Sequence, residues 1–209
     1  MKVSLLPYFV LILMGAAWGL GIALTKITVA TGYGPFVLIF WQFVLGTIIL
    51  GFISIMRRKL PFFGRKTIFL FTVLALLGAI FPNSANYVAT YYLPAGFIAI
   101  LIATVPMFSF PIAMLMGLEK IDFRRIAGII VGFCGVLVLT GPDAGIPDKV
   151  FLIFIPLALV APLFYALEGN YVDKYGTSGQ DPIQTFTGVS ILGTLMVLPI
   201  VFATGQWIN

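Results

Sequence analysis

Residues 15–36 read GAAWGLGIALTKITVATGYGPF, and a shift of 147 positions aligns them without a gap with residues 162–183, which read PLFYALEGNYVDKYGTSGQDPI. The register continues into the next apolar stretch and pairs Trp18 with Tyr165. Six paired positions are identical: Leu20 and Leu167, Gly32 and Gly179, Pro35 and Pro182, and the Leu-Gly-Thr tripeptides at 45–47 and 192–194. An internal duplication explains this pattern, and the alternative is a chance resemblance between two glycine-rich apolar segments.

The two stretches belong to a chain with the composition of a membrane protein. Of its 209 residues, 61% are hydrophobic and 9% are charged, against roughly 25% charged in a soluble domain. A spanning helix needs about 20 mainly apolar residues, and the apolar runs here are too continuous for the alternating pattern of a membrane β-barrel. The sequence therefore predicts an all-α polytopic membrane protein with seven spans, over residues 7–30, 35–56, 68–90, 95–118, 126–140, 150–172 and 182–204.

The two aligned segments are five spans apart, and because five is an odd number they cross the membrane in opposite directions. Inverted repeats of this kind build many secondary transporters, with the substrate site near the bilayer midplane between the two halves. Two complete units would make about 294 residues. We therefore expect one complete five-helix unit over residues 1–145 and the first two helices of a second unit over 146–209, in a truncated product or a fragment.

Basic residues gather in the short connections on one side of the predicted spans. Five lie between the second and third spans and three between the fourth and fifth, while Lys2 and Lys174 fall on the same side. The opposite side has only Lys149, beside two aspartates. Because cytoplasmic loops carry an excess of Lys and Arg, we expect a cytoplasmic N-terminus, an external Asn209 and a multi-pass location in the plasma (inner) membrane.

The chain offers few side chains for covalent chemistry. Histidine is absent and Cys134 is the only cysteine, which excludes histidine-based triads, His/Cys zinc sites and internal disulfides. We expect Cys134 to be a small buried apolar residue. The net charge of +5 is explained by membrane loops. We therefore expect no enzyme, no metal site, no cofactor and no nucleic-acid partner.

The third predicted span carries a polar face. Asn83, Asn86, Tyr87 and Thr90 are spaced three, four and seven residues apart, so they share one side of a helix. Pro82 should loosen the helix just before them. Polar side chains that cannot face lipid turn to the bundle interior, where they bond other helices or line a wet cavity. Both roles stay open, and Gln42 is the expected neighbour in either.

Trp18 lies near the middle of the first span, where its indole N–H needs a partner. The small residues beside it, Gly15 and Gly19, favour close approach of another helix. For Trp18 and its repeat partner Tyr165 we expect a cavity wall. The candidate substrate site therefore consists of residues on four predicted spans: Trp18, Gln42, Asn83, Asn86, Tyr87 and Tyr165.

Two charged residues are candidates for gating or coupling. Lys26 lies near the outer end of the first span, where it either extends to the headgroups or serves as a gate or as a partner for a substrate carboxylate. Glu168 lies toward the cytoplasmic end of the sixth span. A carboxylate shielded from water could couple proton movement to transport, and the alternative is a water-exposed interfacial glutamate. We expect Lys26 and Glu168 at opposite depths, too far apart to pair.

Three blocks of the chain resemble the EamA family of the drug/metabolite transporter superfamily. They are AAWG followed by Lys26, ATYYLPAGFIAILIATVPMF over residues 89–108, and GLEKIDFRRIAGIIVGFCGVLVL over residues 117–139. The resemblance implies a ten-helix carrier of two inverted five-helix units that moves small metabolites or amino acids, usually outward. Family members often carry an arginine where this sequence has Gln42, so recognition of an anionic group by this helix is in doubt.

The sequence thus favours a secondary carrier with alternating access, working in the lipid bilayer on a small-molecule substrate. The alternative is a truncated or partner-dependent membrane module without transport of its own, which would need a homo-oligomer or another chain to supply the remaining helices. An intramembrane enzyme should show an acidic cluster, a histidine pair or a serine nucleophile with a base, and none of these is apparent in the sequence.

Overall fold

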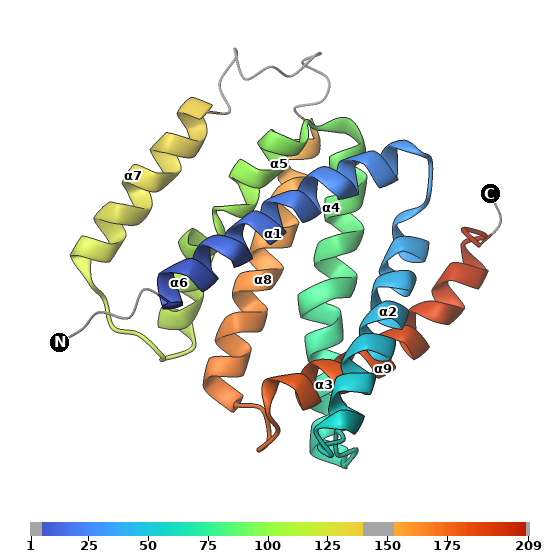
Figure 1. The fold of residues 1–209 in the computed structure, drawn as a ribbon. Helices are drawn as coiled ribbons and strands as arrows, with labels where there is room; N and C mark the ends of the chain where they lie inside the picture. Colours follow the sequence, from blue (N-terminus) through green and yellow to red (C-terminus); the bar gives the residue numbers. More distant parts are fainter. Residues whose placement is uncertain (1–5, 140–152, 208–209) are drawn as a thin grey trace.

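The computed structural model describes residues 6–139 and 153–207, and over these residues the chain is a bundle of helices without a strand (Figure 1). Six helical stretches are long and apolar enough to cross a membrane. Two of them are interrupted, because Arg65–Tyr92 consists of α3, η1 and α4, and Ala95–Leu115 consists of α5 and α6. The helices are α1 (Leu6–Ala30), α2 (Pro35–Met56), α3 (Arg65–Ala75), η1 (Leu76–Ile80), α4 (Phe81–Tyr92), α5 (Ala95–Ile102), α6 (Val105–Leu115), α7 (Phe123–Leu139), α8 (Ile155–Tyr175) and α9 (Pro182–Ala203).

The predicted fifth span corresponds to α7, whose described part has 17 residues. At 1.5 Å per residue this is about 26 Å, slightly short of the hydrocarbon core, and the following residues are not described. The helix stands at the edge of the bundle and packs mainly on α5 and α6 (Figure 1). Because so little covers α7, Cys134 is exposed, and the prediction that it is buried is wrong.

The closest helix pair is α2 and α9, which pack along one another and hold most of the larger apolar core. Gly193 of α9 lies against the Phe43 ring of α2, and Gly46 of α2 lies against the Ser190 hydroxyl of α9. Both helices are 22 residues long and both begin with a proline. A glycine with positive φ precedes each by three residues, Gly32 at 91° and Gly179 at 80°. The shift of 147 positions therefore maps the first and last residues of α2 onto the first and last residues of α9.

The predicted loosening near Pro82 is observed as η1, a π-helical turn that ends two residues before this proline. Proline has no N–H to bond the carbonyl four residues earlier, which is that of Gly78, and the turn widens there. The next helical stretch breaks at Ala103 and Thr104, just before Pro106 in the first turn of α6. Both breaks leave backbone groups inside the bundle available to other partners.

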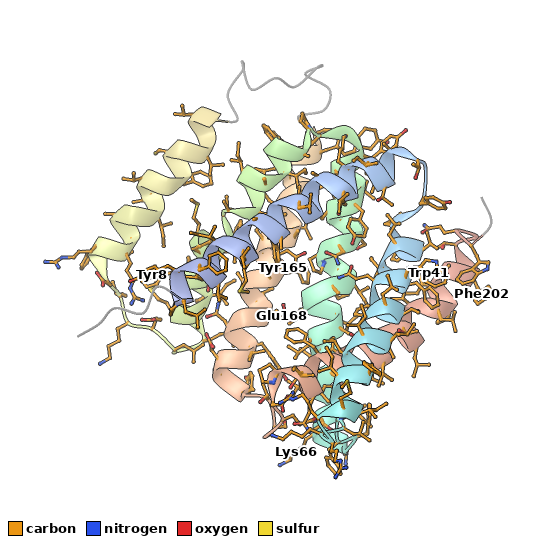
Figure 2. All side chains as sticks on the ribbon, in the orientation of Figure 1. Tyr8, Trp41, Lys66, Tyr165, Glu168 and Phe202 are labelled. Carbon is orange, nitrogen blue, oxygen red and sulfur yellow. The ribbon has the colours of Figure 1, made fainter. Side chains whose placement is uncertain are left out.

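Three connections gather at one end of the molecule. The α2–α3 connection joins the start of α9 through an ion pair of 2.9 Å between Arg57 and Asp181. Lys174 at the end of α8 donates to the carbonyl of Met116 after α6, at 2.9 Å. Lys66 lies at this end and Trp41 near the other end of α2 (Figure 2). The predicted grouping of basic loops on one side is therefore present.

Several residues of the predictions lie outside the described residues: Lys2, Asp143, Asp148, Lys149, Asn209 and the unit boundary at 145–146.

Candidate functional site

A cavity of about 790 Å³ lies between α1, α4 and α8, with α2, η1 and α9 completing its wall. α1 crosses over α4 and α5 in Figure 1, and only Val29 of this helix is buried. The cavity lining includes all six residues of the predicted substrate site and Glu168, while Lys26 is not part of it. The polar or aromatic lining residues are Trp18, Thr25, Gln42, Asn83, Asn86, Tyr87, Thr90, Tyr165, Glu168 and Phe186.

A chain of hydrogen bonds runs across the cavity wall from α8 to α2. The Tyr165 hydroxyl donates to Asn83 Oδ1 at 2.8 Å, and Asn83 Nδ2 donates to Gln42 Oε1 at 3.0 Å. The Tyr87 hydroxyl donates to the same Gln42 oxygen, also at 3.0 Å. Asn83 is therefore the central member, which uses both ends of its amide to connect α8 with α2. Of the two roles left open for the polar face of α4, bonding to other helices is observed, and the same residues line the cavity.

Trp18 reaches the cavity from α1 and meets the one residue to which the sequence repeat matches it. Its ring and that of Tyr165 are 6.2 Å apart at an interplanar angle of 78°, an edge-to-face arrangement that aromatic pairs favour. Figure 2 shows Tyr165 and Glu168 together on α8.

A Cβ at Gly15 or Gly19 would meet no atom within 4 Å. The prediction that these glycines allow a helix to pack closely is therefore wrong, because this half of α1 lies on the surface of the described bundle.

Two buried polar atoms in the cavity wall have no hydrogen-bond partner among the described residues. They are Asn86 Oδ1, in a residue that is 7% exposed, and Thr90 Oγ1, in a residue that is fully buried. Unsatisfied buried polar atoms are uncommon in folded proteins because each costs the free energy of its lost hydration. Both residues belong to the cavity lining, but these two atoms are themselves enclosed by protein.

Glu168 lies one turn beyond Tyr165 on α8, directly against the π-helical turn. A Cβ at Gly78 would collide with its carboxylate, so the Glu168 side chain lies directly against the backbone of this glycine. Among the described residues, no ion pair holds this carboxylate, since the three pairs present join other groups. The side chain is partly buried and lines the cavity. An acidic group therefore faces the site without a basic partner from the described chain.

Lys26 connects α1 to the end of α4. Its Nζ donates to the carbonyls of Thr90 and Tyr91, at 2.7 and 2.9 Å. These carbonyls belong to the last turn of a helix that ends at Tyr92, where backbone oxygens lack partners within the helix and the helix dipole favours a cation. Lys26 and Glu168 form no ion pair, as predicted. The structure thus gives Lys26 a structural contact that neither sequence interpretation included.

Nine lining residues were absent from the sequence-based site, among them Thr25, Gly78 and Phe186. Thr25 lies seven residues after Trp18, so the helical period alone could have placed it on the same face. Gly78 faces Glu168 only because of the π-helical turn, and Phe186 reaches the cavity from α9. Neither of these two has a periodic signal that distinguishes it from an ordinary packing residue.

The all-helical bundle and its six apolar spans define a polytopic membrane protein. The model of the EamA-like transporter family matches residues 5–141. An uncharacterized transporter of Archaeoglobus fulgidus is 22% identical over 193 residues, which cover 92% of this chain and 66% of that protein. The uncharacterized transporters YvbV and YdfC of Bacillus subtilis are 27% and 25% identical, over 84% and 75% of this chain and 55% and 50% of their own lengths.

No solved structure matches the chain. The chain spans between half and about two thirds of the length of these curated relatives. Because the family model covers more than half of the sequence, the chain belongs to the EamA-like transporter family, and the predicted resemblance is confirmed.

Proposed function

We propose that this chain forms part of a secondary carrier that exports small metabolites or amino acids by alternating access, without covalent chemistry. The observation that supports this most directly is the cavity of about 790 Å³ that brings the six predicted residues together with Glu168. It has the mixed character of a small-molecule site, with aromatic walls and a few polar groups. Membership of a transporter family supports the same conclusion.

The proposed architecture is an inverted repeat, with a complete unit over residues 1–145 and the start of a second over 146–209. Reciprocal contacts in the α2–α9 interface support it. Gly46 lies against Ser190, and the shift of 147 positions converts this pair into Gly193 against Phe43, which is also a contact. A pseudo-twofold axis between the helices relates contacts in this way, as it does in a twofold dimer. The cavity would then lie between the units, as in other inverted-repeat carriers.

We further propose that the N-terminus is cytoplasmic and that the protein resides in the plasma (inner) membrane. The clustering of Arg57, Lys66 and Lys174 at one end of the bundle supports this orientation, because positive residues are retained on the cytoplasmic side. The lipid bilayer is the surrounding medium, and a homo-oligomer or a partner that supplies further helices belongs to the same proposal.

The test of transport is solute flux in proteoliposomes, measured by counterflow with a panel of labelled amino acids and amines. Replacing Asn83 and Asn86 together by leucine should abolish flux, because it removes the centre of the hydrogen-bond chain and a free acceptor. The control is Ser84→Ala on the same helix, whose hydroxyl bonds only the Phe81 carbonyl and lies outside the cavity lining.

Unchanged flux in the double variant, with normal insertion, would remove this cavity from consideration. No flux by the chain alone, but flux after co-expression with a chain that carries further helices, would support the partner-dependent module instead.

Proton coupling through Glu168 is a second, separable element of the proposal. Its carboxylate lines the cavity and is partly buried, and the other titratable groups that face it are Tyr165 on α8 and Tyr87 on α4. If Glu168 carries the coupling proton, flux driven by a pH gradient should become insensitive to that gradient in Glu168→Gln, while exchange at equal pH continues. An unaltered pH dependence in this variant would contradict coupling through Glu168.

A further inference from the structure

Among the described residues, the cavity wall contains an acidic side chain but no basic one. Among the described residues that line it, Glu168 is the only acidic one, and none is a lysine or an arginine. The nearest lysine on α1 is Lys26, whose Nζ is already bonded to the Thr90 and Tyr91 carbonyls. Gln42 presents a neutral amide. A solute that enters this cavity therefore meets one acidic side chain and no basic one from the described chain.

The hydrogen-bonding groups of the wall include both acceptors and donors. Asn86 Oδ1 is buried without a donor among the described residues, and the Glu168 carboxylate has no ion-pair partner there. Both are acceptors only, whereas the Thr90 hydroxyl, also unpartnered, can act as either donor or acceptor. The Gln42 oxygen is already used twice, by Asn83 and Tyr87. A ligand that donates hydrogen bonds can bond the Glu168 carboxylate, whereas the amide nitrogens of Gln42 and Asn86 are donors on the same wall.

Aromatic rings line the same space. Trp18 and Tyr165 meet edge to face at 6.2 Å, and Tyr87 lines the wall from α4. A cation within about 6 Å of an aromatic face is attracted to the ring, most strongly to tryptophan and more so when water is excluded. Ile22 and Ile102 add apolar surface for the rest of a ligand. The wall thus combines one carboxyl group with aromatic faces.

We propose that the cavity binds an organic ammonium ion with an apolar or aromatic body and no carboxylate, its charged group held by Glu168 and its body against Trp18 and Tyr165. This inference rests on the proposed carrier function and narrows its solute class. A carboxylate on the ligand would approach Glu168 without a lysine or arginine to compensate it. Anionic and zwitterionic solutes should therefore bind more weakly than amines of the same size.

The fluorescence of Trp18 provides a direct measure of ligand binding. In a chain with Trp41→Phe and Trp207→Phe, Trp18 is the only tryptophan, and its fluorescence reports ligands that enter the cavity. Purified protein in detergent is titrated at neutral pH with three probes that share a benzyl group: benzylamine, benzyl alcohol and phenylalanine. Calorimetric titration of the unsubstituted chain provides the same comparison if the double substitution disturbs the fold.

We expect benzylamine to bind about tenfold more tightly than benzyl alcohol, and phenylalanine to bind no better than the alcohol. Glu168→Gln should bring benzylamine to the level of the alcohol. Asp173→Asn, on the same helix but outside the cavity lining, should leave the preference unchanged. Equal affinities for the amine and the alcohol, or a preference that survives Glu168→Gln, would overturn the inference.

These experiments distinguish a failure of the ammonium-site inference from a failure of the proposed carrier function. Charge-selective binding that depends on Glu168, without flux in liposomes, supports the ammonium site and contradicts transport by this chain alone. Flux of neutral solutes without charge-selective binding supports the carrier and overturns the ammonium site.

Discussion

Two pairs of helical segments are related by the same shift along the sequence, and they are packed in different ways. α2 and α9 lie in close contact, with Gly46 against Ser190 and Gly193 against Phe43. α1 and α8 meet through the rings of Trp18 and Tyr165, whose centroids are 6.2 Å apart, and a cavity opens beside them. One pair forms the core of the bundle and the other forms the wall of the candidate site.

The difference follows from the size of the side chains at matched positions. Glycine on each of two facing helices allows their backbones to approach and an aromatic ring to fill the space opposite. Two aromatic rings at matched positions hold the helices apart instead. The residues on the separated pair are then free to be polar, because they face a cavity rather than a closed interface. The α2–α9 pair should therefore tolerate substitution least, and α1 should be the more mobile element.

The largest effect on stability should come from adding one methyl group to the interface between α2 and α9. A Cβ at Gly193 would lie 2.5 Å from Phe43 Cζ, and Phe43 is only 4% exposed, so the ring has little room to move. We expect Gly193→Ala to lower the free energy of unfolding by about 1–3 kcal/mol, as overpacking does elsewhere. The measurement is detergent-induced unfolding followed by circular dichroism.

Gly51→Ala on α2 is the matched control. A Cβ at this position would meet nothing within 4 Å, so the same change should be neutral or should stabilise the helix by up to about 1 kcal/mol. Equal effects of the two substitutions would mean that the α2–α9 interface is not the tightly packed core that the geometry describes.

A smaller effect is expected where α1 is attached to α4. Lys26→Met removes two hydrogen bonds from a charged donor to the end of α4, at 2.7 and 2.9 Å, and should cost about 1–2 kcal/mol. Hydrogen exchange should rise in α1 and at the end of α4 and stay unchanged in α2 and α9. Thr28→Val, which removes a bond within α1 only, should alter little. Lost flux with unchanged exchange would instead favour the gating role for Lys26.

The sequence predicted most of the bundle and seven of the residues that the structure brings to the cavity, while the role of these residues as a substrate site stays a prediction. Continuous apolar runs predicted each described span to within a few residues, because lipid requires every backbone group to be bonded within its helix. The spacing of Asn83, Asn86 and Tyr87 placed them on one face, and the polar face then had to turn inward. The match of Trp18 with Tyr165 by the repeat corresponds to a ring contact in the structure.

Features that depend on how the helices are placed could not be predicted in this way. Lys26 bonds carbonyls that are 64 and 65 positions away, which no local pattern encodes. The approach of Glu168 to Gly78 depends on a π-helical turn. The misplaced expectations for Gly15 and Cys134 share one cause, since both rest on the rule that small residues pack inside, whereas α1 and α7 are the least covered helices described.

The smallest effect on stability is expected at the start of α9, which is the polar end of the α2–α9 pair. Asp181 Oδ1 accepts from the Gln184 backbone N–H at 3.0 Å, and its other oxygen meets Arg57 at 2.9 Å. These contacts, the backbone one first, lower the pKa of the Asp181 carboxyl. Because the folded-state pKa lies below the unfolded value, the stabilisation is complete above the usual carboxyl range and is lost as the pH falls through the lowered pKa. Both side chains are partly exposed, at 36% and 25%, so water and salt reduce the contribution.

Hydrogen exchange in the first turn of α9, followed from about pH 7 to about pH 3 and corrected for the intrinsic pH dependence of exchange, should therefore show a small loss of protection at the acidic end. In Asp181→Asn the cap is kept, since asparagine caps a helix as well as aspartate does, but the ionisation is gone and the acidic loss should disappear. An acidic loss of the same size in this variant would assign it to another carboxylate. Protection along the interior of α9 should not change in either protein, because Gly193 and its apolar neighbours hold that part of the helix without a titrating group.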